Sequence, residues 1–171
     1  MAEPPPGVRP ITEGDAATGF RCGKKPLDDY FARHAVANDR SGVGKAFVLP
    51  GCVEAGEPEV LGYYTISMAL LGSAEAASVL CTRLPRYPMP VALIGRLAVH
   101  EQARGRGLGE MLLGDAFDRI VGVSDQIGCL GVIVDAIDEG AERFYLKYAF
   151  TTVEETAFPR RMFLPLGSLR G

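Results

Sequence analysis

A glycine-rich turn between an apolar run and a helical pattern is the segment best suited to chemistry. Glycine occupies three of the six positions in Arg104-Gly105-Arg106-Gly107-Leu108-Gly109. The first turn of a helix has unpaired backbone N–H groups and a partial positive charge, and glycine lets the backbone approach a ligand. The turn, with its two arginines, therefore predicts an anion site of the kind that binds phosphate.

Two other phosphate-binding loops are excluded by residue type and position. The turn does not end in Gly-Lys-Ser/Thr, as a P-loop does. The dinucleotide fingerprint spaces its glycines differently and follows an early first strand. A tight strand-to-helix connection without a ligand remains the alternative interpretation.

The elements around the turn alternate between strand and helix patterns. Val91–Val99 is a nearly continuous apolar run, typical of a strand covered on both faces. Apolar residues then recur at helical spacing from Leu108 to about Gln126. Leu130–Ala136 is a second apolar strand, and Asp138 can cap a following helix. This order predicts an α/β sheet with a crossover connection.

The outer parts of the chain predict further elements from turn residues and apolar spacing. They are a short strand at Val8–Ile11, a helix opening at Pro26 with Leu27, Phe31 and Ala35 on one side, a hairpin of Ala46–Leu49 with Val60–Met68, and closing strands at Phe150–Val153 and Met162–Leu164.

Length and composition favour one globular domain over residues 1–171, with the first seven residues flexible. The chain is 47% hydrophobic and 23% charged, which is neither disordered nor fibrous. Its most apolar stretch, Ser67–Leu80, is broken by polar residues and glycine and is too short to span a bilayer. The start, Met1-Ala2-Glu3, has an acid where a secretory signal carries a positive charge, so we expect a cytoplasmic protein.

The four cysteines lie about thirty to fifty residues apart, whereas metal pairs and redox motifs place two within a few residues. We therefore expect isolated, reduced thiols and no metal. Cys81 and Cys129 are expected near or within the core. The two histidines, His34 and His100, lack the spacing of metal ligands or of a catalytic triad.

Charge is unevenly distributed, although the formal net charge is −3. Residues 81–109 contain five arginines and one acid, whereas residues 110–142 contain eight acids and one base. The asymmetry indicates that one element faces an anion, while the acidic stretch reads as solvated helix faces. The negative net charge argues against a surface that is basic all over, as generic DNA-coating proteins have.

Three adjacent motifs resemble the GNAT superfamily of acyl-CoA-dependent N-acetyltransferases. They are Arg104-x-x-Gly107-x-Gly109, the preceding Gly95–Val99 and the following Phe144–Phe150. The resemblance covers Val91–Phe150 and implies an α/β (α+β) fold with a mixed, mostly antiparallel sheet, splayed at the acetyl-CoA site and flanked by helices. It implies a pyrophosphate bound by backbone amides of the glycine-rich turn. The cofactor-binding residues it implies are Leu97, Ala98, Val99, Arg104, Gly105, Arg106, Gly107, Leu108, Gly109, Glu110, Asp138 and Phe144, the last also a packing residue.

The outer segments are similar to the acetyltransferase toxins of type II toxin-antitoxin modules. The similarity is carried by Cys22–Phe31, Gly62–Ser67, Pro90–Val99 and Met162–Leu166. It implies acetylation of the α-amino group of the amino acid on charged tRNA, which blocks translation. It also implies a homodimer, held inactive by a ribbon-helix-helix antitoxin, that meets operator DNA only through the antitoxin complex.

Two residues depart from the superfamily pattern. Ala149 stands where glycine is usual, which puts the local turn in doubt, and Asp138 stands where asparagine is frequent, which puts a contact to the cofactor arm in doubt.

Tyr145 is the candidate catalytic acid, because its place in the motif matches the tyrosine that points at the thioester sulfur. A phenol with a pKa of about 10 is protonated at neutral pH and can donate a proton to the leaving thiolate. Without the resemblance, Tyr145 would read as a core aromatic of an amphipathic helix.

Many GNAT enzymes carry a glutamate base on the central strand, but Val91–Val99 contains no carboxylate. This absence favours an amine that is already partly neutral. An α-amino group has a pKa of about 8, against about 10.4 for a lysine side chain, so aminoacyl esters fit better than lysines or polyamines.

Phosphate contacts by lysine and arginine supply most of the sequence-independent affinity for RNA. Arg96 is singled out because an arginine in an apolar strand needs a partner or an opening. The candidate tRNA-binding residues are Lys24, Lys25, Arg33, Arg83, Arg86, Arg96, Arg160 and Arg161.

The sequence is also compatible with two other functions. One is a GNAT acetyltransferase that acts on a small amine or a protein N-terminus, whose site should be enclosed and often acidic. The other is a catalytically idle acyl-CoA-binding module that acts through a partner, against which Tyr145 argues.

Overall fold

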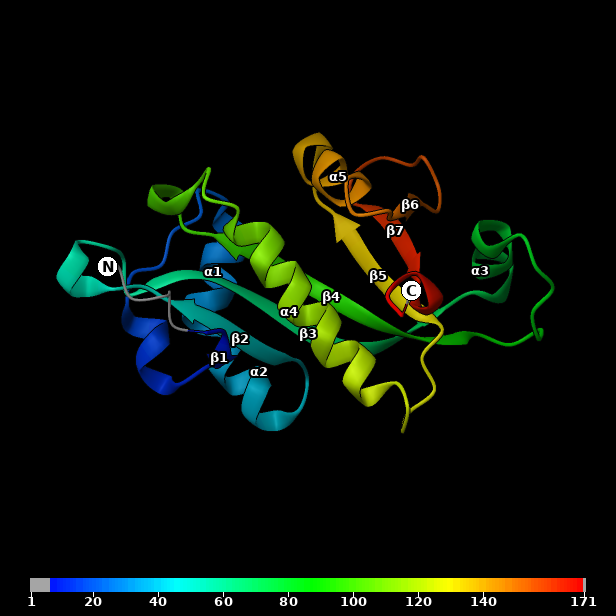
Figure 1. Ribbon diagram of the computed structural model, residues 1–171, viewed down its shortest axis with the longest axis horizontal. Coiled ribbons are helices and arrows are strands. Elements are labelled where there is room, and N and C mark those ends of the chain that lie inside the picture. The colour runs from blue at the N-terminus through cyan, green and yellow to red at the C-terminus, as the bar shows by residue number, and fades with distance from the viewer. Residues whose placement is uncertain (1–6, 171) are drawn as a thin grey trace. The chain divides into compact units, whose positions relative to one another are not determined.

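The computed structural model describes residues 7–170, in which seven strands form one sheet of order β1-β2-β3-β4-β5-β7-β6 (Figure 1). The pairs β1–β2, β2–β3, β5–β7 and β6–β7 are antiparallel, and β4–β5 is parallel. The predicted mixed, mostly antiparallel sheet with accompanying helices is therefore confirmed. The strands are β1 (Arg9–Pro10), β2 (Lys45–Pro50), β3 (Val60–Leu71), β4 (Met89–Val99), β5 (Gly131–Ala136), β6 (Thr151–Thr152) and β7 (Arg160–Pro165).

Five α-helices accompany these strands within the described residues. They are α1 (Lys25–Arg33), α2 (Ala35–Ser41), α3 (Ser73–Leu80), α4 (Leu108–Val123) and α5 (Glu139–Leu146). None of the helices in residues 7–170 is long and apolar enough to cross a membrane.

The chain divides into two compact units, each formed by two separate stretches of sequence. The first contains residues 1–67 and 96–117, and the second contains residues 68–95 and 118–171. The expectation of a single domain stays a prediction. The expected flexibility at the start concerns residues that lie, apart from Gly7, outside the described part of the chain.

The core of the first unit is an aromatic cluster where α1 packs on β3. The ring of Phe31 lies 4.7 Å from that of Tyr63 and 5.0 Å from that of Phe20, centroid to centroid. The Tyr63 hydroxyl, buried with its ring, donates to the Leu27 carbonyl at 2.7 Å. Burying these rings and satisfying this hydroxyl fixes α1 against the sheet.

The predicted first helix is interrupted. His34 has φ −125° and ψ −28°, so α1 ends at Arg33 and α2 begins at Ala35. The His34 N–H still donates to the Tyr30 carbonyl at 2.8 Å, and the Asn38 N–H donates to the His34 carbonyl at 2.9 Å. The apolar spacing continued across the break because both helices bury the same side against one core.

The predicted hairpin is confirmed, with β2 and β3 in register from Lys45↔Ile66 to Leu49↔Gly62. Figure 1 shows β1, β2 and α2 grouped in this unit. Gly62 has no room for a side chain, because a Cβ there would lie 2.7 Å from Leu112 Cδ1 and 2.8 Å from the Ala98 carbonyl oxygen. Glycine therefore permits β3, the end of β4 and the start of α4 to approach closely.

The second unit is built on β5, which pairs in parallel with Ala92–Ile94 of β4 and antiparallel with β7 along its whole length. Its core contains Leu71, Val91, Ile133 and Phe163, each fully buried. Strands β4 and β5 are parallel and α4 lies between them in the chain, which confirms the predicted crossover connection.

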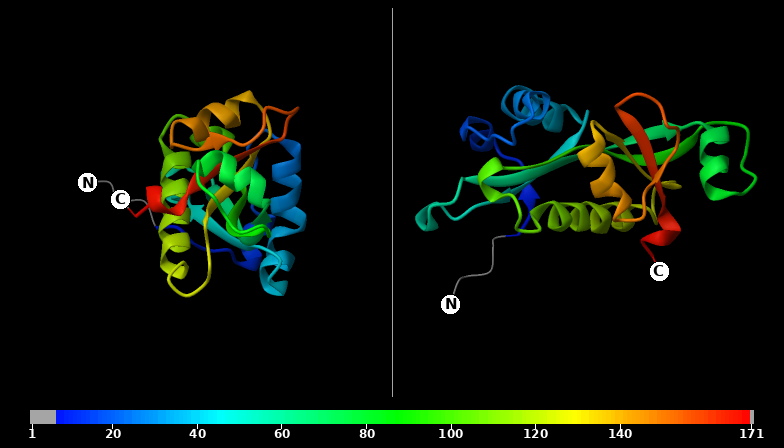
Figure 2. Two further views of the ribbon diagram at one scale, coloured as in Figure 1. Left: turned by 90° about the vertical axis from the view of Figure 1, so that its right-hand side faces the viewer. Right: turned by 90° about the horizontal axis from the view of Figure 1, so that it is seen from above.

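Helix α3 and the loop after it were not predicted from the sequence. They follow the end of β3 and precede β4 in the green part of the ribbon (Figure 2). Ala76 is buried in the core of the second unit, and Val79 and Leu80 pack against it.

All four cysteines carry free thiols, but the expected core position of Cys81 is wrong. Cys81 is exposed, in the left-handed conformation (φ 53°) that ends α3, whereas Cys129 is half-buried. Cys22 is the buried cysteine, and burial raises the pKa of its thiol to about 11.

Candidate functional site

The glycine-rich turn belongs to the first unit and joins the end of β4 to α4. The His100 N–H donates to the Leu61 carbonyl at 2.8 Å, which ties the strand end to β3. A short 3₁₀ turn, Glu101–Ala103, follows, and His100 Nδ1 accepts from the Gln102 N–H at 3.1 Å. The turn itself then places Gly105 and Gly107 at φ 78° and 74°. These left-handed conformations explain why glycine stands at both positions.

Helix α4 starts at Leu108, directly after the second left-handed glycine. Leu108 and Leu112 are buried and anchor the first turn of this 16-residue helix. The backbone N–H groups of the first turn have no partner within the helix, and the helix dipole makes them a favourable place for an anion. The predicted residues Leu108, Gly109 and Glu110 supply these groups, so the local geometry fits a bound pyrophosphate.

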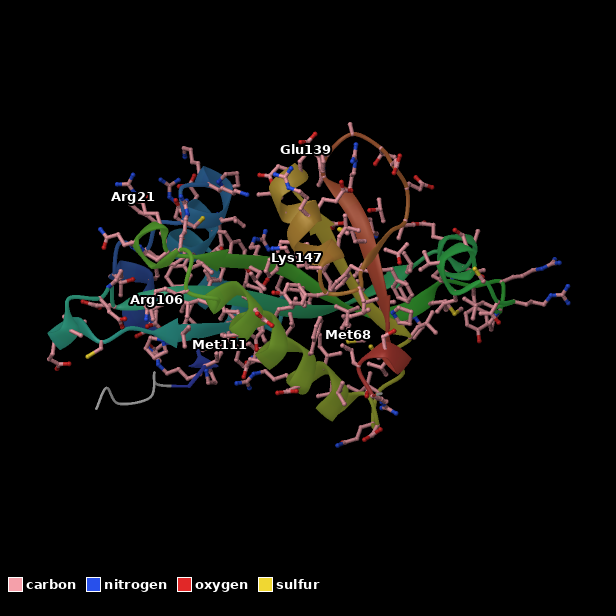
Figure 3. The ribbon with its side chains drawn as sticks, turned by 45° about the horizontal axis from the view of Figure 1, so that its top comes forward. Arg21, Met68, Arg106, Met111, Glu139 and Lys147 are labelled. Atoms are coloured by element: carbon pink, nitrogen blue, oxygen red, sulfur yellow. The ribbon has the colours of Figure 1, made fainter. Side chains whose placement is uncertain are left out.

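The two arginines of the turn are engaged by neighbouring segments of the same unit. The Arg104 guanidinium donates to the Cys22 carbonyl. The same segment is also bound through the backbone, because the Glu101 N–H donates to the Arg21 carbonyl at 2.8 Å. Arg106, labelled in Figure 3, forms an ion pair with Glu57 at 2.8 Å. Glu57, in the connection between β2 and β3, also accepts from the Cys52 N–H at 2.9 Å. Both guanidinium groups therefore have partners within the protein: a carboxylate for Arg106 and a neutral carbonyl oxygen for Arg104.

The other predicted cofactor residues of this unit are Leu97, Ala98 and Val99, the last three residues of strand β4. Ala98 is buried, and Leu97 and Val99 are half-buried. Their role in binding the cofactor stays a prediction.

Helix α5 belongs to the second unit and begins with the predicted cap. The Asp138 side chain accepts from the Ala141 N–H at 2.8 Å. A carboxylate at this position also interacts favourably with the helix dipole. The capping role of Asp138 is confirmed, and its contact with a cofactor arm stays a prediction.

Tyr145 is buried on α5, with 7% of its surface exposed. Its ring lies 5.2 Å from that of Phe144 and 5.3 Å from that of Phe150, centroid to centroid. Burial raises the pKa of Tyr145 above that of an ordinary phenol. The hydroxyl is therefore protonated at neutral pH, as a proton donor must be.

The chain leaves α5 through a turn in which Ala149 adopts φ 71°. The Tyr145 carbonyl accepts from the Tyr148 N–H at 3.0 Å and from the Phe150 N–H at 3.3 Å. Alanine here takes the left-handed conformation that glycine would take without strain. The turn questioned at Ala149 therefore forms.

Four of the candidate tRNA-binding residues lie in the first unit. Lys24 precedes α1, Lys25 and Arg33 begin and end it, and Arg96 is on β4. The Arg96 guanidinium carbon lies 3.5 Å from the centroid of the Tyr30 ring, which supplies the partner expected for this arginine. Lys25 pairs with Asp29 one helical turn further on.

The other four lie in the second unit and fall into two classes. Arg83 and Arg86 are exposed in the connection between α3 and β4. Arg160 and Arg161 form ion pairs instead, Arg160 with Glu142 at 3.1 Å and Arg161 with Asp135 at 3.0 Å. Arg160 and Arg161 are thus already engaged by carboxylates of the protein.

The comparisons with known proteins identify the class of enzyme. Residues 59–152 match the family described as an acetyltransferase (GNAT) domain, and this range contains both the glycine-rich turn and α5. The chain belongs to the GNAT acetyltransferase family.

Its relatives include bacterial toxins. The chain is 36% identical, over 83% of its length and 82% of the relative's, to the "tRNA-acetylating toxin" of Mycobacterium tuberculosis. The solved structure "AtaT complexed with acetyl-methionyl-tRNAfMet" is 27% identical with a TM-score of 0.80, covering 95% of this chain and 96% of that one. A mutant of the same toxin "bound to the C-terminus of the antitoxin AtaR" is 25% identical with a TM-score of 0.77, covering 95% and 94%. A related structure is "bound with AcCoA".

Proposed function

We propose that this protein transfers the acetyl group of acetyl-CoA to the α-amino group of the amino acid on charged tRNA, as the toxin of a toxin-antitoxin module. Similarity to a tRNA-acetylating toxin over 83% of the chain carries the choice of substrate. The buried, protonated Tyr145 and the glycine-rich turn support the chemistry.

Acetyl-CoA supplies an acetyl thioester, whose transfer to an amine forms an amide bond and breaks the carbon–sulfur bond. In this proposal the backbone N–H groups at the start of α4 hold the pyrophosphate, and Leu97–Val99 hold the pantetheine arm through backbone atoms. Tyr145 would donate its proton to the departing thiolate and regain one from solvent, and the amine proton would pass to solvent. General acid catalysis of this kind contributes about 100-fold or more.

The acceptor is an amine that needs little help to lose its proton. Strand β4 has no carboxylate between Val91 and Val99 to act as a base. An α-amino group, with a pKa of about 8, is partly neutral at physiological pH, whereas a lysine side chain is not. Ester-linked amino acids meet this requirement.

Binding of tRNA in this proposal uses basic residues of each unit, of which Lys25, Arg33, Arg83 and Arg86 are exposed and Lys24 and Arg96 are half-buried. Lys24, Lys25, Arg33 and Arg96 serve in the first unit, and Arg83 and Arg86 serve in the second. Arg160 and Arg161 contribute only if phosphate displaces their carboxylate partners.

We also propose a cytoplasmic homodimer that a ribbon-helix-helix antitoxin neutralises, with operator DNA bound through the antitoxin complex. Binding of a related toxin to the C-terminus of its antitoxin supports a peptide partner of this kind.

The test is transfer of radiolabelled acetyl from acetyl-CoA to a pool of charged tRNAs, with free amino acids, polyamines and a peptide N-terminus in parallel. The proposal predicts label on charged tRNA and none on the same tRNA after deacylation. Label on small amines or peptide alone would instead support an acetyltransferase of those substrates. Acetyl-CoA binding with no transfer to any acceptor would support an idle binding module.

A further inference from the structure

Helix α5 is joined to the edge of the sheet by one carboxylate that accepts three hydrogen bonds. Glu142 Oε1 accepts from Arg160 Nη1 at 3.1 Å, and Glu142 Oε2 accepts from the same nitrogen at 3.4 Å. Glu142 Oε2 also accepts from the Thr152 hydroxyl at 3.2 Å. Thr152 is on β6 and Arg160 is on β7, so Glu142 connects α5 to both strands.

The partner arginine has two further contacts that restrain it. Arg160 Nε donates to the Thr156 carbonyl at 2.7 Å, and its guanidinium carbon lies 4.2 Å from the centroid of the Phe158 ring. The side chains of Arg160 and Glu142 are only 26% and 16% exposed. A charge-assisted pair that is largely withdrawn from water and has further fixed contacts is stronger than a typical surface ion pair.

Glu142 lies three residues before Tyr145, so the two side chains are neighbours along the surface of one short helix. An eight-residue helix is not stable by itself, and its position depends on its tertiary contacts. The Tyr145 ring contributes apolar contacts with Phe144 and Phe150, which restrain it without fixing the rotation of α5 as hydrogen bonds do.

We propose that Glu142, held by Arg160 and Thr152, is a positioning residue that fixes α5 on the β6–β7 edge and thereby places the Tyr145 hydroxyl for proton donation. This inference rests on the proposed role of Tyr145 as the acid. It also gives Arg160 a function in catalysis instead of direct contact with tRNA.

The neighbouring ion pair, Arg161 with Asp135, does not connect a helix to the sheet as the Glu142 pair does. Arg161, the next residue, donates to Asp135 at 3.0 and 3.2 Å, and these two residues are directly opposite each other on β7 and β5. That pair joins two strands that already share a full ladder, whereas the Glu142 pair joins a helix to them.

The test is steady-state acetylation of charged tRNA by Glu142→Gln, with Glu139→Gln as the matched control. Glu139 occupies the same first turn of α5 and is exposed, so its replacement removes a similar charge from the helix start without removing the anchor. A displacement of about 1 Å in a catalytic group can lower a rate by up to about 100-fold. We expect Glu142→Gln to lower kcat about tenfold and to change KM for acetyl-CoA less than twofold, while Glu139→Gln stays near wild type.

A double-mutant cycle with Tyr145→Phe separates positioning from other effects. If Glu142 acts through Tyr145, Glu142→Gln lowers kcat in the wild-type background and has no further effect when Tyr145 is already phenylalanine. Multiplied effects in the double variant would contradict the inference, as would equal kcat values for Glu142→Gln and Glu139→Gln.

Two further measurements keep the outcomes distinct. If Glu142→Gln does not fold, Thr152→Val and Arg160→Lys remove one hydrogen bond and the guanidinium fork respectively, and each should lower kcat at unchanged KM for acetyl-CoA. If neither does so, the inference is overturned. An unchanged kcat for the single variant Tyr145→Phe would overturn the proposed role of Tyr145 as the acid. A reduced kcat for Tyr145→Phe together with unchanged kcat values for the Glu142 and Thr152 variants would overturn only the positioning role of Glu142.

Discussion

Arg106 in the glycine-rich turn is paired with Glu57 of the β2–β3 connection, with Nη2 and Oε1 2.8 Å apart. An anion bound at the start of α4 would meet a turn whose nearest arginine is already neutralised by a carboxylate. Glu57 therefore lowers the contribution of Arg106 to the positive potential for phosphate, to which the backbone N–H groups, the helix dipole and Arg104 also contribute.

We predict that Glu57→Gln tightens acetyl-CoA binding about two- to fivefold at low salt. The change removes a negative charge near the anion site and frees Arg106, and the effect is modest because salt and solvent screen partly exposed pairs of this kind. Titration calorimetry of acetyl-CoA against both proteins measures it, with Glu54→Gln in the same connection as the control. Weaker binding in Glu57→Gln would show instead that the pair is needed to order the turn.

Replacing Ala149 with glycine should stabilise the protein by about 0.5 to 1 kcal/mol. The left-handed conformation at φ 71° costs alanine about 1 to 2 kcal/mol, and glycine avoids this cost. Part of the gain is lost because glycine has more conformational freedom in the unfolded state. Urea unfolding measures the difference. Ala141→Gly, within α5, should have the opposite sign and cost about 1 kcal/mol. Destabilisation by both substitutions would contradict the backbone argument.

Asp15 should make folding stability depend on pH in the acid range. Burial raises the pKa of this carboxyl, but hydrogen bonds from the Arg9 guanidinium and from Thr12 outweigh burial and hold the pKa below its usual value. The stabilisation is therefore present above the unfolded pKa of about 3.9 and is lost as pH falls through the lower folded pKa.

Asp15→Asn should consequently cost about 2 kcal/mol at pH 7, since hydrogen bonds to a charged group are removed. The difference from wild type should shrink as the pH is lowered below about 4. Urea unfolding of both proteins at a series of pH values checks this. Glu13→Gln, which removes an exposed pair with Arg40, should change stability by at most about 0.5 kcal/mol. A difference for Asp15→Asn that is constant with pH would contradict the account.

The two classes of arginine in the second unit should respond differently to salt. Arg86 is exposed, so Arg86→Gln should weaken tRNA binding and reduce the slope of log affinity against log salt by about 0.7 to 0.9. Arg160→Gln should leave the slope nearly unchanged, because Glu142 occupies its guanidinium. Filter binding of charged tRNA at several salt concentrations measures the slope for both variants. Equal changes in slope would show that Arg160 contacts RNA phosphate as Arg86 does.

Much of the fold could be predicted because its signals are local. The apolar run at Val91–Val99 gave the central strand within two residues of β4, and Asp138 was recognised as the cap of α5. The glycine-rich turn was also found, since left-handed backbone at Gly105 and Gly107 requires a residue type visible in the sequence.

The remaining features depend on contacts between distant residues. Helix α3 was missed because its alanine-rich, weakly amphipathic sequence follows β3 after one glycine, and packing on a core decides its conformation. The break at His34 has no proline or glycine to mark it. The partners of Arg106 and Arg160 could not be foreseen, because Glu57 and Glu142 carry no pattern that distinguishes them from solvated carboxylates. Only the folded chain brings these pairs together.

The most direct test of the central claim is single-turnover acetylation of charged tRNA by the wild-type protein and by Tyr145→Phe, with the acetylated amino acid identified after its release from the tRNA. The account predicts an N-acetylated amino acid from the wild-type reaction and a rate at least about 100-fold lower for Tyr145→Phe, with acetyl-CoA affinity retained. Equal rates for the two proteins, or no acetyl group on the released amino acid, would contradict it.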